Sequence, residues 1–311
     1  MERLPSANCP RCGAPRTPTP ECPHCGVYYA KAEARVAQPA LALAPEEPPA
    51  PLAPAPAERL TWNEDAEDAR RELMIRVFAV PAALLLTWAL HNTGMGHSLL
   101  RIFLSMWIHE LGHAVTAWLT GFTAFPGPWA TSIAEVRSPS FSVLLALGFG
   151  ALVYRGWRIN HRPTLIAGIV LLCLQAVGTL FVRSGMARSF ISFGGDGGCL
   201  VLGTLLMTTL YAGKNSSLHR GWTRWGLLVI GAASFTDAFT TWRNARTDYG
   251  SIPFGRIEGV GLSDPTKLVD WFGWSVDSII SRYVNLGWAC LAVLGMVYVL
   301  GVLRARAALR A

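Results

Sequence analysis

The chain has 311 residues, of which 51% are hydrophobic and only 15% charged, and its formal net charge is +7. Soluble domains carry roughly 25% charged residues, so the composition excludes an ordinary soluble protein and predicts a polytopic membrane protein in a lipid bilayer. A positive charge can also indicate nucleic-acid binding. Here, however, the basic residues form short clusters between apolar runs, as in cytoplasmic loops, and we expect no nucleic-acid partner.

Two paired cysteine motifs stand near the start of the chain. Cys9 and Cys12 form one pair, Cys22 and Cys25 the other, and each pair is followed by glycine. Two residues between the cysteines let both sulfurs reach one ion, and the glycine permits the tight turn beneath it. Residues 1–30 therefore predict a structural zinc site with four cysteine ligands, with disulfides as the alternative. The module resembles the zinc-ribbon heads of many bacterial membrane proteins.

A different composition follows at residues 31–60. Most of this segment is rich in alanine and proline, which favours extended polyproline II and supplies no core, so we expect a semi-rigid linker. Thr61 and Glu64 match a capping box, and a helix is predicted to start there and to lead into a membrane domain at 61–311. The first apolar run begins only near Leu73, so we expect no secretory signal and a reducing compartment for the cysteines.

The remaining chain alternates between apolar runs and short polar segments. A bilayer core takes about 20 apolar residues to cross, so the runs predict an all-α polytopic domain with six or seven spanning helices. The runs cover residues 73–91, 99–120, 140–155, 163–182, 198–213, 224–242 and 286–303.

The basic clusters predict an orientation for these helices. They place 155–162, 214–224 and the C-terminus in the cytoplasm. Simple alternation then puts the N-terminus outside, whereas a reduced zinc ribbon requires it inside. The segment 121–139, broken by proline and glycine, is the expected source of this conflict, because it could dip into the membrane. The polar stretch 243–285 is expected to be a solvated loop or short helices.

Three ionisable residues interrupt the second apolar run. His109 and His113 are four residues apart and therefore lie on one face of a helix, where both imidazoles can bind one metal ion. Glu110 projects beside them as a candidate general base. Ionisable residues at bilayer depth are costly and usually functional. The pattern predicts a catalytic zinc site, with three satisfied polar residues in a helix bundle as the alternative.

A catalytic zinc usually has a third protein ligand, and two aspartates in later apolar segments are candidates. Asp196 lies in the sequence GGDGG, where the glycines allow a break in the helix that would bring its carboxylate to the ion. It could also cap the following helix. Asp237 is the secondary candidate, with pairing to Arg243 or a place in a substrate groove as alternatives. His91 and His97 are expected to be interfacial polar residues.

HELGHA inside an apolar helix, with a downstream Asp-Gly-Gly leading into another, resembles the site-2 proteases, the intramembrane zinc metalloproteases. The resemblance covers roughly residues 73–213. It implies that His109, His113 and Asp196 bind zinc and that Glu110 activates water, while Gly112 permits close helix packing. The implied function is hydrolysis of peptide bonds in membrane-associated substrates, in the bacterial inner membrane with the ribbon in the cytoplasm. The alternatives are an inactive scaffold of the same fold and a zinc-handling membrane protein.

Overall fold

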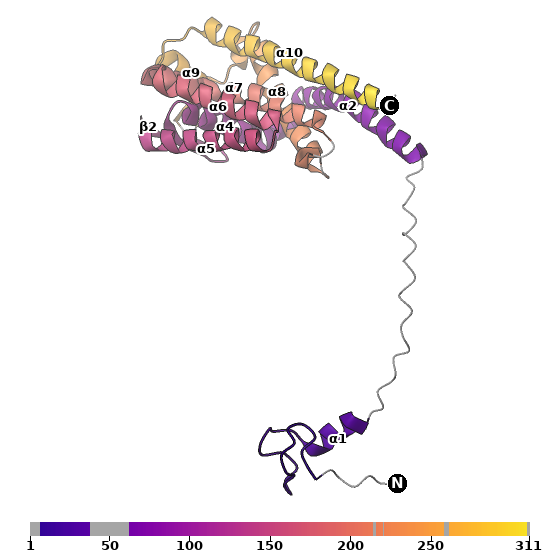
Figure 1. Cartoon of the computed structure of the whole chain (residues 1–311). Coiled ribbons are helices and arrows are strands. Elements are labelled where there is room, and N and C mark those ends of the chain that lie inside the picture. Colours follow the sequence, from indigo (N-terminus) through magenta and orange to yellow (C-terminus); the bar gives the residue numbers. More distant parts are fainter. Residues whose placement is uncertain (1–6, 38–61, 214–215, 220, 258–260, 310–311) are drawn as a thin grey trace. The chain divides into compact units, whose positions relative to one another are not determined.

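The chain forms two separate units. The computed structural model describes residues 7–37, 62–213, 216–219, 221–257 and 261–309 (Figure 1). One unit comprises Met1–Thr61 and the other Trp62–Ala311. The linker expected at 31–60 begins later than predicted, because residues 31–37 are helical. Its remainder, the capping residue Thr61 and the side chain of Glu64 lie outside what the structure describes.

The small unit is built from two cysteine knuckles followed by helix α1 (Tyr29–Ala37). The backbone N–H of Gly13 donates to the carbonyl of Cys9, and that of Gly26 donates to Cys22. Both glycines have positive φ, 73° and 68°, a conformation that glycine adopts without steric cost. The glycines therefore close the two knuckles, as their positions after the cysteine pairs predict.

The large unit is mostly helical. Its α-helices are α2 (Trp62–His91), α3 (Gly94–Leu99), α4 (Met106–Leu119), α5 (Pro139–Arg158), α6 (Arg162–Leu180), α7 (Ser184–Thr208), α8 (Thr223–Asn244), α9 (Asp264–Asp270) and α10 (Val276–Ala308). A π-helical segment, η1 (Leu100–Ser105), joins α3 to α4, and η2 (Thr209–Tyr211), η3 (Ser217–His219) and η4 (Tyr249–Ser251) are single 3₁₀ turns.

Five described helices are long and apolar enough to cross a membrane, which supports the prediction of a membrane protein. They are Glu67–His91, Pro139–Arg158, Arg162–Leu180, Ser184–Tyr211 and Val276–Ala308. The expected spans at 99–120 and 224–242 are largely helical as well, in η1–α4 and in α8. Each of the seven apolar runs thus corresponds to helix.

The expectation of a purely α-helical fold was wrong at two places. Residues 121–139 contain an antiparallel hairpin of β1 (Phe122–Pro126) and β2 (Thr131–Arg137), and a smaller hairpin joins β3 (Arg256–Ile257) to β4 (Gly261–Leu262). The Trp118 indole N–H donates to the Ala124 carbonyl at 2.9 Å, which fixes β1 to α4. The prolines and glycines of this segment therefore end α4 and turn the chain into a hairpin.

Helix α7 lies at the centre of the large unit and contacts α4, α8, α9 and α10. The glycines around Asp196 do not break it, because the helix runs without interruption from Ser184 to Thr208. They allow α4 to approach instead: a Cβ on Gly112 would lie 2.2 Å from the Gly194 carbonyl oxygen and 2.8 Å from the Gly198 Cα. The predicted helix break was wrong, and the expected close packing at Gly112 is confirmed.

Candidate metal centres

The histidine pair of α4 points into the interior of the large unit. His109 and His113 are both buried, and their Nε2 atoms lie 3.2 Å apart. A Cβ on Gly195 of α7 would lie 2.6 Å from the His109 Nε2 and 2.7 Å from the His113 Cε1. Only glycine at this position leaves room for both rings, so the α4–α7 contact is shaped around them.

A third ligand atom reaches the pair from α9. The Asp264 Oδ2 lies 3.2 Å from the His109 Nε2 and 3.0 Å from the His113 Nε2. Burial by itself would raise the pKa of the Asp264 carboxyl, but the two imidazoles lower it well below its usual value. A lower pKa favours the ionised form, which is the form of a carboxylate that binds metal. Asp264 begins the short helix α9, within the polar stretch 243–285 that was expected to be a solvated loop or short helices.

Asp196, the predicted third ligand, lies beside His109 but on the other side of its ring from Asp264, in a separate group with His109 and Cys199 that could also hold a metal ion. Its Oδ1 lies 2.9 Å from the Nδ1 of His109, on the ring edge away from Asp264. Its Oδ2 accepts a hydrogen bond from the Trp242 indole at 2.8 Å. Since Asp196 lies inside α7, it does not cap that helix. It orients His109 and leaves the Nε2 of that ring facing Asp264.

The second histidine is held in the same way. The Nδ1 of His113 lies 2.6 Å from the Ile191 carbonyl oxygen, to which it can donate. Metal-binding histidines almost always donate their other ring N–H to a carboxylate or a backbone carbonyl, which fixes the tautomer. His109 and His113 show both versions of this arrangement, and both keep Nε2 available.

The two histidine Nε2 atoms and the Asp264 Oδ2 are separated by distances that suit three ligands of one metal ion. Their mutual distances of 3.0–3.2 Å are close to the edges of about 3.3 Å in a tetrahedron with zinc–ligand bonds of about 2.0–2.1 Å. His109, His113 and Asp264 therefore form a group that could hold a metal ion.

Glu110 lies next to this triad, where a hydroxyl of the hairpin holds its carboxylate. The Thr131 Oγ1 is 2.7 Å from the Glu110 Oε2 and 2.8 Å from the Glu110 carbonyl oxygen. A cavity of about 540 Å³ includes the triad, Glu110 and hairpin residues Trp129–Thr131 in its lining. The triad could hold a metal ion, and the Glu110 carboxylate lines the same cavity.

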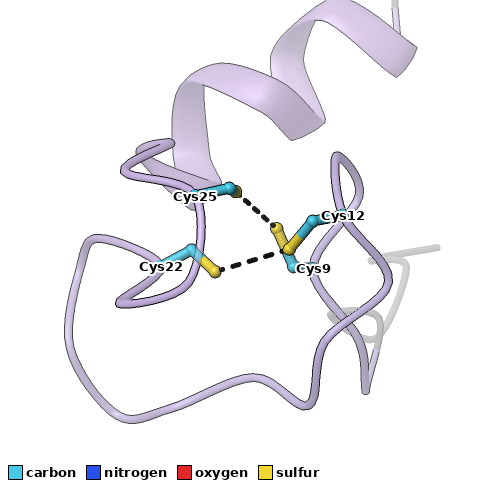
Figure 2. Close-up of side chains that lie close together, drawn as sticks. All are labelled: Cys9, Cys12, Cys22 and Cys25. Atoms are coloured by element: carbon cyan, nitrogen blue, oxygen red, sulfur yellow. Dashed lines mark hydrogen bonds between the residues drawn. The ribbon is translucent and has the colours of Figure 1, made fainter.

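The four cysteines of the small unit also converge (Figure 2). The Sγ atoms of Cys9 and Cys25 are 3.7 Å apart and those of Cys12 and Cys22 are 3.8 Å apart. These distances match the edge of about 3.8 Å in a tetrahedron with zinc–sulfur bonds of about 2.3 Å, whereas a disulfide needs about 2.05 Å.

Three of these thiols have shifted pKa values, and that of Cys9 is lowered, chiefly by the backbone N–H of Cys12. Burial raises the pKa of Cys22, but the backbone N–H groups of His24 and Cys25 outweigh it and lower this pKa to about 6. The Val27 N–H lowers the pKa of Cys25, but burial and the neighbouring thiols raise it to about 12. The lowered pKa favours the thiolate of Cys22, and the raised pKa favours the thiol of Cys25, which would release its proton on binding metal.

The secondary candidate, Asp237, does not lie in the triad. Its Oδ2 is 2.9 Å from the Arg101 Nη1, and its Oδ1 faces His97 and His91. Its ion-pair partner is Arg101 of η1, and not Arg243, which was one of the alternatives for this residue.

Sequence reasoning found the histidines, Glu110 and the cysteines of these centres but missed Asp264. Asp264 is 155 residues from His109, and nothing in its local sequence differs from an ordinary acidic residue in the first turn of a helix. In comparisons with known proteins, no protein-family model, no curated protein and no solved structure matched this chain.

Proposed function

We propose that the large unit is an intramembrane zinc metalloprotease that hydrolyses peptide bonds of membrane-associated substrates. The observation that carries this proposal is the convergence of the His109 Nε2, the His113 Nε2 and the Asp264 Oδ2 within 3.2 Å, with Glu110 beside them. Two imidazoles and one carboxylate are a common ligand set of catalytic zinc, which keeps one position open.

In this proposal His109, His113 and Asp264 hold the ion, and Asp196 positions His109. Zinc, when bound there, supplies Lewis acidity that polarises a carbonyl group and makes water a stronger nucleophile at neutral pH. The proposed ligand set replaces Asp196, which the family resemblance suggested, by Asp264, because only Asp264 faces Nε2 of both histidines.

Glu110 is proposed as the general base and acid. Its carboxylate would take the proton from the attacking water and later give it to the leaving amine. The Thr131 hydroxyl holds one carboxylate oxygen, which restrains the side chain in the cavity that the triad also lines. A scaffold protein would not need a general base at this position.

The substrate is proposed to bind in extended form along the cavity. The amides of a transmembrane helix are hydrogen-bonded internally, so the helix must unwind before a peptide bond can be attacked. The β1–β2 hairpin contributes Trp129–Thr131 to the cavity. A two-stranded sheet has open edges to which an extended peptide can add, and this hairpin is the proposed template.

The proposed location and membrane topology are those expected from the sequence. We place the chain in the bacterial inner membrane with six or seven crossings, the five described candidates being joined by the η1–α4 region and α8. The small unit would be a cytoplasmic zinc ribbon that recruits or restrains substrates. Its sulfur separations support a tetrahedral zinc site.

The test is a Glu110→Gln variant of the full chain in proteoliposomes containing a fluorogenic transmembrane peptide. General acid–base catalysis contributes about 10²–10⁴-fold, so cleavage should fall by that factor while the zinc content stays unchanged. Glu67→Gln is the matched control, because Glu67 is exposed on α2, outside the hairpin, and should leave cleavage intact. Equal cleavage by the Glu110→Gln variant and the parent would refute the assignment.

The same experiment separates the two alternatives. A scaffold would show no cleavage by the parent chain, and its binding partners would be unaffected by Glu110→Gln. A zinc-handling protein would move zinc across the vesicle membrane. Arg101 lies between the carboxylates of Asp196 and Asp237, and a fixed cation at that point is unfavourable for the passage of metal ions.

A further inference from the structure

A second group of metal-binding side chains lies in the large unit outside the proposed active site. His91 is the last residue of α2, His97 lies in α3 and Asp237 lies in the middle of α8. The His97 Nε2 is 3.3 Å and the His91 Nδ1 3.6 Å from the same Asp237 oxygen, Oδ1. The three ligand atoms all lie within 4.8 Å of one another. Three separate helices thus direct one ligand atom each toward a common point.

Two of these atoms lack the hydrogen bonds that buried polar atoms normally make. Asp237 is fully buried, and neither its Oδ1 nor the His91 Nδ1 makes a hydrogen bond of normal geometry with a described residue, although the His97 Nε2 lies 3.3 Å from this oxygen. Buried polar atoms are nearly always satisfied, so each exception calls for an explanation such as an ion. A proton shared by His97 and Asp237 would satisfy the carboxylate oxygen but would leave the His91 nitrogen without a partner. One metal ion would satisfy all three atoms.

We propose that His91, His97 and Asp237 bind a second divalent metal ion. Two imidazoles and one carboxylate oxygen suit zinc and other divalent transition metals such as cobalt, nickel or iron(II), and are a poor set for calcium or magnesium. The separations of 3.3 and 3.6 Å are close to the edge of about 3.3 Å of a tetrahedral zinc site. The side chain of His97 is 46% exposed, which gives an ion access to the otherwise buried group.

The second site is distinct from the triad, although Arg101 connects the two. The Arg101 Nη1 lies 2.9 Å from the Asp237 Oδ2 and 3.5 Å from the Asp196 Oδ1. Asp237 therefore presents one oxygen to the histidines and the other to Arg101, and Asp196 in turn orients His109. An ion at the second site would fasten the end of α2 and the start of α3 to α8. The inference does not depend on proteolysis.

The first test is the zinc content of the full chain after loading and removal of loosely bound ions, measured by inductively coupled plasma mass spectrometry. The parent chain should hold three zinc ions: one on the cysteines, one on the triad and one on the second site. A His91→Gln, His97→Gln double variant should hold one fewer, and so should Asp237→Asn. His161→Gln, at an exposed histidine, should hold the full number. A folded double variant that holds as many zinc ions as the parent chain would overturn the proposal, whatever the occupancy of the other two sites.

A second measurement needs no substitution and so does not depend on whether the variants fold. Diethyl pyrocarbonate modifies accessible imidazole nitrogens, and mass spectrometry identifies the modified residue. Zinc should protect His97 in the parent chain by at least tenfold, whereas the exposed His161 should react equally with and without zinc. Equal modification of His97 in zinc-loaded and metal-free protein would overturn the proposal. Protection of His97 in a Glu110→Gln chain that has lost cleavage would show that the second site is independent of the active site.

Discussion

The two carboxylates nearest the α4 histidines act on opposite edges of the His109 ring. Asp264 faces Nε2 and Asp196 faces Nδ1. In the proposed function, this difference makes Asp264 a ligand and Asp196 a residue that only orients a ligand. Replacing a ligand removes metal, whereas replacing the outer partner of a metal-bound histidine typically weakens affinity or activity by about 10–100-fold.

Substitutions at the two positions should therefore differ in outcome. Asp264→Ala should remove one zinc ion from the full chain and abolish cleavage, because only two protein ligands remain. Asp196→Asn should keep the zinc but raise its dissociation constant about 10–100-fold. Zinc titration against a chelating indicator measures both the number of bound zinc ions and their dissociation constant. Asp270→Asn, at an exposed position of α9, is the control for Asp264→Ala. The opposite ranking of the two variants would return the ligand role to Asp196.

At the scale of elements, the α4–α7 contact places the histidines, and it depends on glycine. Gly112 of α4 meets Gly194 and Gly198 of α7 at backbone distance. The apolar runs predicted where the helices lie, because each run is bounded by basic or turn-forming residues. They could not show that the glycines serve packing, since a glycine run in a helix and one in a break look alike in sequence.

Gly112→Ala tests the contact. The added Cβ would lie 2.2 Å from the Gly194 carbonyl oxygen, a backbone atom that cannot rotate away, so the helices must separate. Overpacking of this kind costs about 1–3 kcal/mol, and the histidines should lose zinc affinity as α4 shifts. Thermal unfolding and zinc titration report the two effects. Gly148→Ala in α5 meets open space and should be neutral or slightly stabilising. An unfolding temperature for Gly112→Ala equal to that of the parent chain would contradict the close approach.

The β1–β2 hairpin provides a second test at this scale. Thr131→Val keeps the shape of the side chain but removes the hydroxyl that holds Glu110. A hydrogen bond to a charged group contributes about 1.5–3 kcal/mol, so kcat should fall by roughly 10–100-fold while zinc content stays constant. Ser132→Ala changes the adjacent, exposed residue of β2 and should leave kcat unchanged. If Thr131→Val raised KM alone, the hydroxyl would serve substrate binding instead of holding Glu110.

At the scale of the whole molecule, local chemistry was predictable and long-range assembly was not. The cysteine pairs and HExxH carry their ligand spacing within a few residues, so sequence alone identified Cys9, Cys12, Cys22 and Cys25, and the α4 pair. Asp264 and the cluster of His91, His97 and Asp237 depend on how separate helices return to one point. No periodicity or spacing in the sequence predicts that these side chains lie close together. In the sequence, His91 and His97 look like ordinary polar residues beside a turn.

The two units should also lose metal independently, because each has its own core and its own ligands. A Cys22→Ser, Cys25→Ser double variant should hold one zinc ion fewer than the parent, since two ligands cannot retain a structural site. Cleavage of a short fluorogenic peptide and thermal unfolding of the large unit should remain within error of the parent values. Cys173→Ser, at an exposed lone cysteine of α6, controls for the loss of a thiol. If the double variant lost peptide cleavage as well as one ion, the ribbon would contribute directly to the active site, and its proposed role in recruiting substrates would have to be abandoned.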